Sequence, residues 1–380
     1  MKIAVQKEID TLERRVALDP DRVQRLTKNE FEVDVEQGAG EGAFFSDQSY
    51  QDAGASIVSD TVALFSQADV VLKLKKPTLE EVEQFKENTL LISFLDPLVD
   101  LDLVQKLREK NISSFSMEMV PRIARAQKMD ALSSMSSLAG YKAVLIAAES
   151  LPKYFPMLIT AAGTIAPAKV LVLGAGVAGL QAIATARRLG AVVSAYDIRP
   201  VVKEQVESLG GNFLEVDLGE DTEAEGGYAK ALSEEAQRKG QEMIHNHVKD
   251  IDAVITTALI PGRPAPELIT EEMVKDMPAG SVIVDLAAEA GGNCKLTEAG
   301  QTVTKHGVLL HGPLNLPSTM SVHASQLYAR NIMAVFEHLI QDNQIHLDFE
   351  DEITRGACVT HKGEVINERV KELVSAKASG

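Results

Sequence analysis

Three glycines, Gly174, Gly176 and Gly179, follow an apolar run and open a helix-forming stretch. This order of strand, Gly-x-Gly-x-x-Gly turn and helix is typical of a site for the pyrophosphate of a dinucleotide. The first glycine permits the tight turn, the second leaves room for the backbone to approach the phosphates, and the third lets helix and strand pack closely. The helix that starts near Val177 directs free N–H groups and its positive dipole end at the phosphates. We therefore expect this turn to bind a dinucleotide.

An acidic residue, Asp197, ends the next apolar run, 18 residues after Gly179. A carboxylate there accepts hydrogen bonds from the adenosine ribose hydroxyls and repels the 2′-phosphate of NADP. Arg199 lies two residues further on and is able to receive a 2′-phosphate, so these residues alone leave the choice of cofactor open. Because the acid stands at the strand end, where the ribose is met, we expect NAD(H).

The composition excludes several classes of protein. The chain has 380 residues, a hydrophobic fraction of 45% and a formal net charge of −17, which disfavours nucleic acid and anionic lipid as partners. Its two cysteines, Cys294 and Cys358, and its histidines have no metal-ligand spacing, so we expect no metal. No uncharged apolar run of about 18 residues occurs, so we expect no direct membrane insertion.

Short β-branched runs alternate with helix-forming stretches over the first 120 residues, which predicts a parallel sheet with helices on both faces. A second glycine-rich turn, Gly38-Ala-Gly40-Glu-Gly42-Ala43, follows one of these strands. No helix-forming run comes directly after it, so we do not expect it to hold phosphate. The expected strands are 2–6, 31–36, 70–74, 90–95 and 112–116, and the expected helices are 20–28, 47–53, 78–86 and 101–110.

Two long apolar helices, 131–148 and 325–339, are expected to cross between two domains. Between them the alternation resumes, with further strands expected at 213–218, 253–256, 281–286 and 308–310. An acidic insert after Leu218, with Tyr228 beside two glycines, is too long for an ordinary connection and is either a mobile lid or a disordered loop. An irregular tail is expected to return to the first domain.

These patterns predict an α/β fold with two Rossmann-like, doubly wound, parallel-sheet domains joined by long crossing helices. The first domain is expected to comprise residues 1–133 plus 330–380, and the second, which carries the glycine turn, residues 134–329.

A further segment, Pro121-Arg-Ile-Ala-Arg-Ala-Gln-Lys-Met-Asp-Ala-Leu-Ser-Ser134, follows the last strand of the first domain. It resembles the nicotinamide loop of the NAD(H)-binding component of proton-translocating transhydrogenases. The resemblance extends over essentially the whole chain. It includes Ile-Thr-Ala-Ala-Gly-Thr at 159–164, Thr-Thr-Ala-Leu-Ile-Pro-Gly at 256–262 and Val-Asp-Leu-Ala-x-Glu-x-Gly-Gly-Asn at 284–293.

The resemblance implies a set of site residues. Those assigned to the nicotinamide and its ribose are Arg122, Gln127, Asp130, Leu132 and Ser133, of which Gln127, Arg122 and Asp130 would act in hydride transfer. Those assigned to the rest of the nucleotide are Gly174, Gly176, Val177, Ala178, Gly179, Asp197, Ile198, Arg199, Gly227, Tyr228, Ala258 and Leu259.

The resemblance also implies the activity and its partners. Hydride would pass directly between NADH on this chain and NADP+ on a partner component, coupled to proton translocation by a membrane component. Such transfer needs no nucleophile or metal, only two rings held about 3–3.5 Å apart in an oriented, dry site. The chain would be a homodimer in the cytoplasm, attached peripherally to the inner membrane through its partners.

Two alternatives remain. Alanine dehydrogenase has the same two-domain layout, and Arg15 and Lys75 match its pyruvate-binding positions. Reductive amination also needs a proton donor, but this chain has Asp96 where that family has a histidine, and Glu289 at a catalytic aspartate position. We therefore expect Arg15 and Lys75 to form surface or loop ion pairs. The chain could also be a nucleotide-binding module without turnover of its own.

Overall fold

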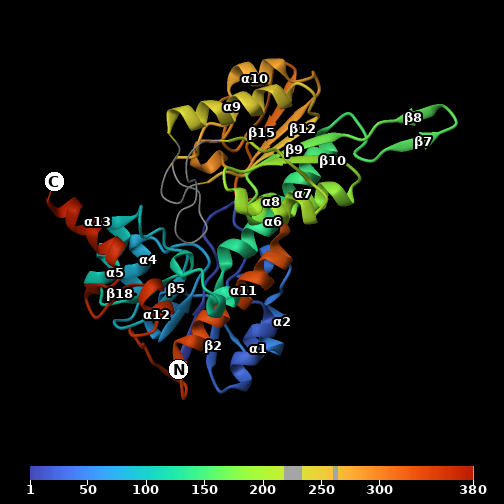
Figure 1. Cartoon of the computed structure of the whole chain (residues 1–380). Coiled ribbons are helices and arrows are strands. Elements are labelled where there is room, and N and C mark those ends of the chain that lie inside the picture. The colour runs from blue at the N-terminus through green and yellow to red at the C-terminus, as the bar shows by residue number, and fades with distance from the viewer. Residues whose placement is uncertain (218–232, 260–263, 380) are drawn as a thin grey trace. The chain divides into compact units, whose positions relative to one another are not determined.

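The structure is a computed structural model that describes residues 1–217, 233–259 and 264–379 (Figure 1). Contacts within the chain divide it into two compact units: Met1–Met135 with Ser318–Gly380, and Ser136–Pro317. Each unit contains a mainly parallel sheet in which the strand order reverses beside the first strand, as in doubly wound folds. The predicted fold class is therefore confirmed.

The sheet of the first unit has eight strands in the described residues, of which the first six in its spatial order are parallel. Its strands, in spatial order, are β3 (Ser56–Val58), β2 (Glu32–Glu36), β1 (Lys2–Val5), β4 (Val70–Leu72), β5 (Leu90–Ser93), β6 (Ser113–Ser116), β18 (Cys358–His361) and β19 (Glu364–Val365). The five expected strands are present, and the expectation that 70–74 is the third strand is wrong. The three-residue β3 precedes it, and a run this short leaves little sequence signal.

Helices of the first unit begin where the sequence supplies capping side chains. The carboxylate of Asp19 accepts the N–H of Arg22 at 2.9 Å at the start of α1, and Thr78 forms a capping box with Glu81 at the start of α4. The helices are α1 (Pro20–Lys28), α2 (Asp47–Asp52), α3 (Thr61–Gln67), α4 (Leu79–Gln84), α5 (Leu101–Glu109), α11 (Ser321–His338), α12 (Glu352–Ala357) and α13 (Glu368–Ser379).

The C-terminal tail is structured, so the expected irregular tail is wrong, but its return to the first unit is confirmed. Strand β18 adds antiparallel to β6, with Cys358 opposite Phe115, and β19 extends the same sheet. A small two-stranded sheet, β16 (Ile340–Gln341) with β17 (Gln344–Ile345), precedes these elements.

Helix α11 belongs entirely to the first unit, so the expected crossing by this helix, and a return at residue 330, are wrong. The hydroxyl of Tyr328 donates to the carbonyl oxygen of Lys73 at 2.7 Å. Ser325 Oγ accepts the N–H of Val16 at 3.1 Å. Contacts on both sides of the helix therefore fix it within this unit. The other long helix, α6 (Ala131–Ser150), runs from the last residues of the first segment into the second unit, as expected.

The sheet of the second unit has seven strands in the described residues, all parallel except its edge strand β14. Residues 213–218 were expected to form a full strand, but β11 has only two residues, and the sequence did not predict β14. The strands, in spatial order, are β11 (Asn212–Phe213), β10 (Val192–Tyr196), β9 (Lys169–Leu173), β12 (Ala253–Thr256), β13 (Val282–Asp285), β15 (Val308–His311) and β14 (Thr302–Lys305).

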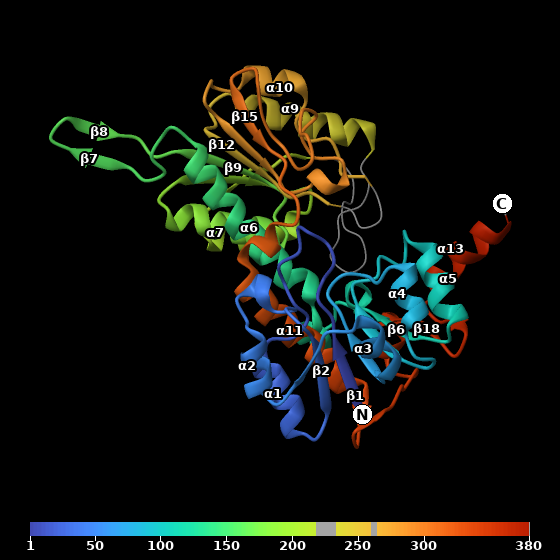
Figure 2. The same ribbon diagram turned by 180° about the vertical axis from the view of Figure 1, so that it is seen from behind.

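Helices cover both faces of this second sheet (Figures 1 and 2). On one face, α6, α7 (Val177–Arg188) and α8 (Lys203–Ser208) pack against Val170 and Val172. On the other face, α9 (Glu234–Val248) and α10 (Glu271–Asp276) pack against Leu171 and Leu173. The alternating side chains of β9 therefore enter two separate cores, which explains why this strand is apolar throughout.

A β-hairpin, β7 (Leu158–Thr160) with β8 (Gly163–Ile165), extends from the second unit away from its sheet (Figures 1 and 2). The sequence did not predict this hairpin. Among the described helices, α6 is long and apolar enough to cross a membrane by length and composition, a test that a core helix of a soluble protein also passes.

Candidate nucleotide-binding site

The glycine turn lies between β9 and α7 of the second unit, as predicted. Gly174 has a φ of +97°, in the region that side chains other than glycine rarely adopt. Its N–H donates to the carbonyl oxygen of Tyr196 at 2.8 Å, so the turn is tied to the end of β10. A Cβ at position 174 would lie 2.6 Å from the hydroxyl oxygen of Thr257. Conformation and space therefore both require glycine at this position.

The other two glycines differ in what surrounds them. A Cβ on Gly179 would lie 1.8 Å from the carbonyl oxygen of Gly174, whereas one on Gly176 would meet no atom within 4 Å. Gly176 is the N-cap of α7 and places no side chain over the helix end. The N-terminal N–H groups of a helix lack partners within the helix, so this backbone surface is open to an anion such as pyrophosphate.

Asp197 is buried directly after β10 and joins the turn to the following loop. Its Oδ2 accepts the N–H of Ala175 at 2.7 Å. The backbone N–H and Nε of Arg199 both donate to Oδ1 at 2.9 Å, and Nη2 donates to Oδ2 at 2.7 Å. The structure thus places the acid expected at the ribose beside the turn expected at the pyrophosphate, with the half-buried Ile198 between Asp197 and Arg199.

The loop after β12 lies beside the glycine turn, because β12 pairs with β9 where the strand order reverses. The Thr257 hydroxyl donates to the carbonyl oxygen of Gly174 at 3.0 Å. Ala258 is half-buried and Leu259 is 50% exposed. The structure therefore brings these two residues, expected from the resemblance, to the same sheet edge as the glycine turn. Ligands of open α/β sheets bind at this reversal point.

Asn293 holds this loop in place and was not among the expected site residues. Its Oδ1 accepts the Ala258 N–H at 3.0 Å, and its Nδ2 donates to the carbonyl oxygens of Ala258 at 2.9 Å and Pro266 at 2.8 Å. Asn293 is fully buried, so these bonds have no competition from water. The only signal in the sequence was the Gly-Gly-Asn string, whose partner lies 35 residues away.

Asp285 supports the same region from below. Its carboxylate accepts hydrogen bonds from the hydroxyls of Thr256 at 2.8 Å and Thr297 at 2.7 Å, and from the N–H groups of Ala287 and Cys294, both at 3.0 Å. Four donors satisfy this fully buried carboxylate, which fixes the end of β13 relative to β12. Burial raises the pKa of the Cys294 thiol to about 11, so Cys294 is an inert structural residue. Gly227 and Tyr228, expected in a closing loop, lie outside the described residues.

The segment expected to meet the nicotinamide belongs to the first unit. It forms a 3₁₀ helix, Ala124–Met129, followed directly by α6. Asp130 starts α6: its Oδ1 accepts the Ser133 N–H at 2.8 Å and its Oδ2 accepts the Ser133 hydroxyl at 2.6 Å. Asp130 is thus engaged at the helix start, and Leu132, like Ser133, is half-buried.

Arg122 and Gln127 are both exposed on this segment. The backbone around them is anchored at two points. Asn331 Nδ2 donates to the carbonyl oxygen of Lys128 at 2.8 Å, and Arg125 Nη1 pairs with Asp351 at 2.9 Å. An anchored backbone with an exposed glutamine amide suits a residue that contacts a ligand ring.

The second glycine-rich turn differs from the first in charge and in helix placement. Asp47 Oδ1 accepts the N–H of Gly38 at 2.8 Å, so a carboxylate already occupies this turn. A short 3₁₀ segment, Glu41–Ala43, follows, and α2 begins only after its own cap, Ser46. A phosphate would meet negative charge there rather than a free helix end.

Arg15 forms a buried ion pair, so the expectation of a surface or loop pair is wrong for this residue. Its Nε and Nη2 each lie 2.6 Å from a carboxylate oxygen of Glu13, and both side chains are at most 5% exposed. Asp96, at the position of the alanine dehydrogenase histidine, is exposed and has a φ of +51°. The backbone N–H of Leu95, directly before it, donates to Glu118 Oε1 at 2.8 Å.

Comparison with protein families decides the relationship. Residues 4–139 match alanine dehydrogenase/PNT, N-terminal domain, and residues 143–368 match alanine dehydrogenase/PNT, C-terminal domain. The chain belongs to the alanine dehydrogenase/PNT family. The two matched domains together cover the glycine turn, Asp197 and the segment around Gln127.

Within the alanine dehydrogenase/PNT family, the chain is more similar to transhydrogenase subunits than to alanine dehydrogenases. It is 49% identical over 376 residues to the first of the chains that make up NAD(P) transhydrogenase subunit alpha in Rhodospirillum rubrum, a match that covers 97% of this chain and 98% of that relative. Its identity to alanine dehydrogenase 2 of Staphylococcus aureus is 31% over 381 residues, covering 98% and 96% of the two chains. The crystal structure of transhydrogenase from Sinorhizobium meliloti is similar with a TM-score of 0.86 at 43% identity, covering 96% of this chain and all of that chain. The resemblance to transhydrogenase is therefore confirmed.

Proposed function

We propose that this chain is the NAD(H)-binding component of a proton-translocating transhydrogenase. The observation that carries the proposal is the glycine turn with Asp197 at its edge, in a chain that matches a transhydrogenase alpha subunit over nearly its full length. The open space over Gly176 and the free end of α7 fit a pyrophosphate, and the Asp197 carboxylate fits ribose hydroxyls.

The nucleotide contacts divide into two groups. Residues of the second unit hold the adenosine and pyrophosphate: Gly174, Gly176, Val177, Ala178, Gly179, Asp197, Ile198, Arg199, Ala258 and Leu259, with Gly227 and Tyr228 added on the resemblance alone. Residues of the first unit contact the nicotinamide and its ribose: Arg122, Gln127, Asp130, Leu132 and Ser133. Among these, Gln127, Arg122 and Asp130 orient the reacting ring.

The reaction is a direct hydride transfer. NADH supplies a hydride, a proton with two electrons, to NADP+ held on a partner component, which yields NAD+ and NADPH. The chain's own residues bind the nucleotide and fix the orientation of its ring, which is sufficient for a reaction that needs no proton donor. A membrane component couples the transfer to proton movement, and this chain is attached peripherally to the inner membrane through these partners.

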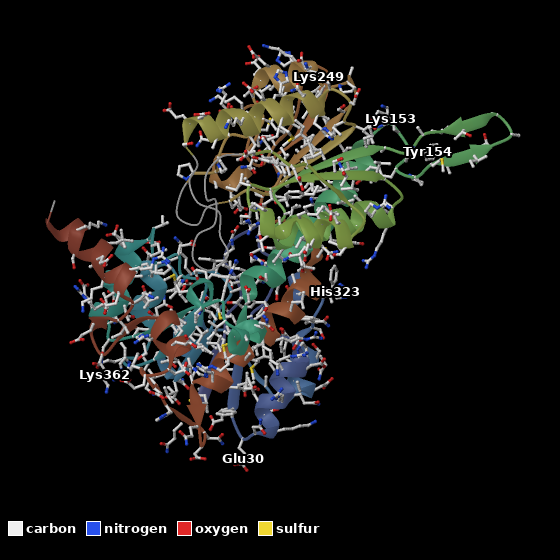
Figure 3. All side chains as sticks on the ribbon, in the orientation of Figure 1. Glu30, Lys153, Tyr154, Lys249, His323 and Lys362 are labelled. Carbon is white, nitrogen blue, oxygen red and sulfur yellow. The ribbon has the colours of Figure 1, made fainter. Side chains whose placement is uncertain are left out.

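The chain is also proposed to form a homodimer, and the β7–β8 hairpin is the element that favours this. Residues 154–168 contain no charged side chain, and Ile159 is 77% and Met157 56% exposed. Lys153 and Tyr154 mark the start of the hairpin arm (Figure 3). An isolated two-stranded hairpin is at best marginally stable in water, so this uncharged arm is expected to be covered. Helix α11, whose apolar residues are buried within the first unit, contributes little to this argument.

Alanine dehydrogenase activity is disfavoured by the residue at position 96. Reductive amination of a 2-oxo acid needs a proton donor near the carbonyl. This chain has an exposed aspartate there, which lacks the near-neutral pKa that suits an imidazole to this task.

The test combines binding with turnover. The full chain is titrated with NADH and NADPH, and tight NADH binding with weak NADPH binding is expected. It is then mixed with NADH and an NADP+ analogue, with and without the NADP(H)-binding and membrane components, and turnover is expected only with the partners. NADH oxidation that depends on pyruvate and ammonia would instead identify an alanine dehydrogenase, and binding without turnover in the full assembly would indicate a non-catalytic module.

A further inference from the structure

The hydrogen bonds of Asp197 fill all of its acceptor positions. A carboxylate has about four lone-pair sites. The N–H of Ala175, the N–H of Arg199, and Nε and Nη2 of Arg199 supply four donors, two to each oxygen. Two of these come from the backbone and two from the guanidinium group. A ribose hydroxyl that donates to Asp197 must therefore displace a donor already present.

The guanidinium bonds are the ones that can be displaced. The backbone donors belong to the glycine turn and to the residue after Ile198, so they move only if the backbone moves. The guanidinium group sits on a flexible side chain that is 16% exposed, whereas the side chain of Asp197 is 6% exposed. An Arg199 side chain that turns outward keeps its charge in water, and Asp197 keeps its two backbone donors.

We propose that Arg199 determines the cofactor preference of this site by competing with the adenosine ribose for Asp197. In the free protein the guanidinium group donates two hydrogen bonds to the carboxylate. When NADH binds, the two ribose hydroxyls take these places and the guanidinium group turns away. The inference rests on the proposed NAD(H) site, and it adds that Arg199 weakens NADH binding and supports NADPH binding.

The effect on NADPH follows from the charge of the displaced group. A 2′-phosphate on the ribose is repelled by Asp197, and the nearby guanidinium group offsets this repulsion by binding phosphate in a bidentate manner. Arg199 therefore reduces the discrimination between the two cofactors in both directions. Without its side chain, Asp197 would present an uncompensated charge that favours hydroxyl donors and rejects phosphate.

The test uses the full chain with Arg199→Ala, Arg199→Gln, Asp197→Ala and the double variant Asp197→Ala/Arg199→Ala. Arg188→Ala is the matched control, because Arg188 is an exposed arginine in the last turn of α7 of the same unit. Dissociation constants are measured for NADH and NADPH, and for ADP-ribose and its 2′-phosphate, which carry the adenosine half without the nicotinamide. Circular dichroism and Tm establish that each variant is folded.

Arg199→Ala is expected to tighten NADH and ADP-ribose by about three- to tenfold and to weaken the 2′-phosphorylated ligands by about tenfold, the effect of one charge-assisted hydrogen bond. Arg199→Gln should shift both constants in the same directions. In the Asp197→Ala background, removal of Arg199 should no longer tighten NADH, because there is no carboxylate to compete for. Arg188→Ala should match the wild type.

Several outcomes would overturn the inference. If Arg199→Ala weakened NADH, Arg199 would support Asp197 rather than compete for it. If NADPH binding were unchanged, the role in selectivity would be wrong. A wild-type chain that bound neither NADH nor ADP-ribose would contradict the proposed function itself, which is a separate result from a normal NADH affinity without any effect of Arg199.

Discussion

The carbonyl oxygen of Gly174 lies 1.8 Å from the position that a Cβ on Gly179 would occupy. The first and third glycines of the turn are therefore coupled through the backbone, and the end of β9 and the first turn of α7 touch without any side chain between them. Gly176, between them, has open space above it. One turn thus contains a glycine required for folding and a glycine required for ligand approach, and substitutions separate the two roles.

Gly179→Ala is expected to destabilise the second unit. The new methyl group meets a backbone oxygen, which cannot move aside as a side chain could. Overpacking of this kind typically costs about 1–3 kcal/mol, partly offset by the better helix propensity of alanine. The measurement is the free energy of unfolding by urea, and a variant as stable as the wild type would contradict the close packing.

Gly176→Ala is expected to leave folding intact and to weaken NADH binding. The backbone of Gly176 is extended, with φ −75° and ψ −167°, which alanine adopts without strain. The methyl group would stand where we expect the pyrophosphate to approach. Tm should match the wild type while the NADH dissociation constant rises by about tenfold or more, as for a lost phosphate contact. Unchanged NADH affinity would place the pyrophosphate elsewhere.

The sequence predicted those parts of the fold that depend on local patterns. Helix α1 and strand β12 were predicted with their observed ends, because capping residues and buried β-branched runs mark them directly. The three-residue strand β3, the edge strand β14 and the hairpin were not predicted. Short or exposed strands lack the continuous apolar run that identifies a buried strand. The contacts of α11 also depend on residues distant in the sequence, such as Lys73.

The candidate site shows the same division. The glycine turn and Asp197 were predictable because their spacing is fixed by one βαβ unit. The support of Ala258 by Asn293 joins residues 35 positions apart, and no spacing rule gives such a pair. Likewise, the burial of the Glu13–Arg15 pair depends on tertiary packing that charge patterning in the sequence does not contain.

Ile159→Asp is expected to convert a dimer into a monomer. Ile159 is 77% exposed on β7, and a charge there would be buried without a partner if the hairpin lies in an interface. Sedimentation of the wild type at micromolar concentration should give a dimer and the variant a monomer. Val99→Asp, at an apolar residue of the first unit that is 72% exposed, is the control and should remain dimeric. A wild-type monomer would contradict the homodimer directly.

Glu118→Gln is expected to stabilise the protein at neutral pH. Burial raises the pKa of the Glu118 carboxyl above its ordinary value of 4.5, although the hydroxyl of Ser116 and the N–H of Leu95 donate to it. A carboxyl whose pKa is raised in the folded state binds more protons there. Its contribution to stability is therefore complete below pH 4.5 and is lost as the pH rises through the folded pKa.

Glutamine stays neutral and keeps an oxygen for the same N–H group, so the Tm of Glu118→Gln should fall less than that of the wild type between pH 4.5 and pH 8. Glu109→Gln, at an exposed glutamate on α5, is the control and should follow the wild type. Parallel curves for the wild type and Glu118→Gln would show that Glu118 does not titrate in this range.

Gln127→Asn is expected to slow hydride transfer far more than it weakens NADH binding. The adenosine half of NADH is expected to be held by the glycine turn and Asp197, which this substitution leaves unchanged. Gln127 is exposed on a segment whose next residue, Lys128, is fixed through its carbonyl oxygen by Asn331, so the shorter side chain retracts its amide without disturbing the backbone.

A displacement of the reacting ring by about one ångström can cost about a hundredfold in rate. We therefore expect a loss of that order in the reconstituted complex at saturating NADH, with only a few-fold change in the NADH dissociation constant. Gln51→Asn shortens an exposed amide on α2 of the same unit and should leave both quantities unchanged. If Gln127→Asn abolished NADH binding but preserved the rate at saturation, Gln127 would hold the nucleotide rather than orient the ring for transfer.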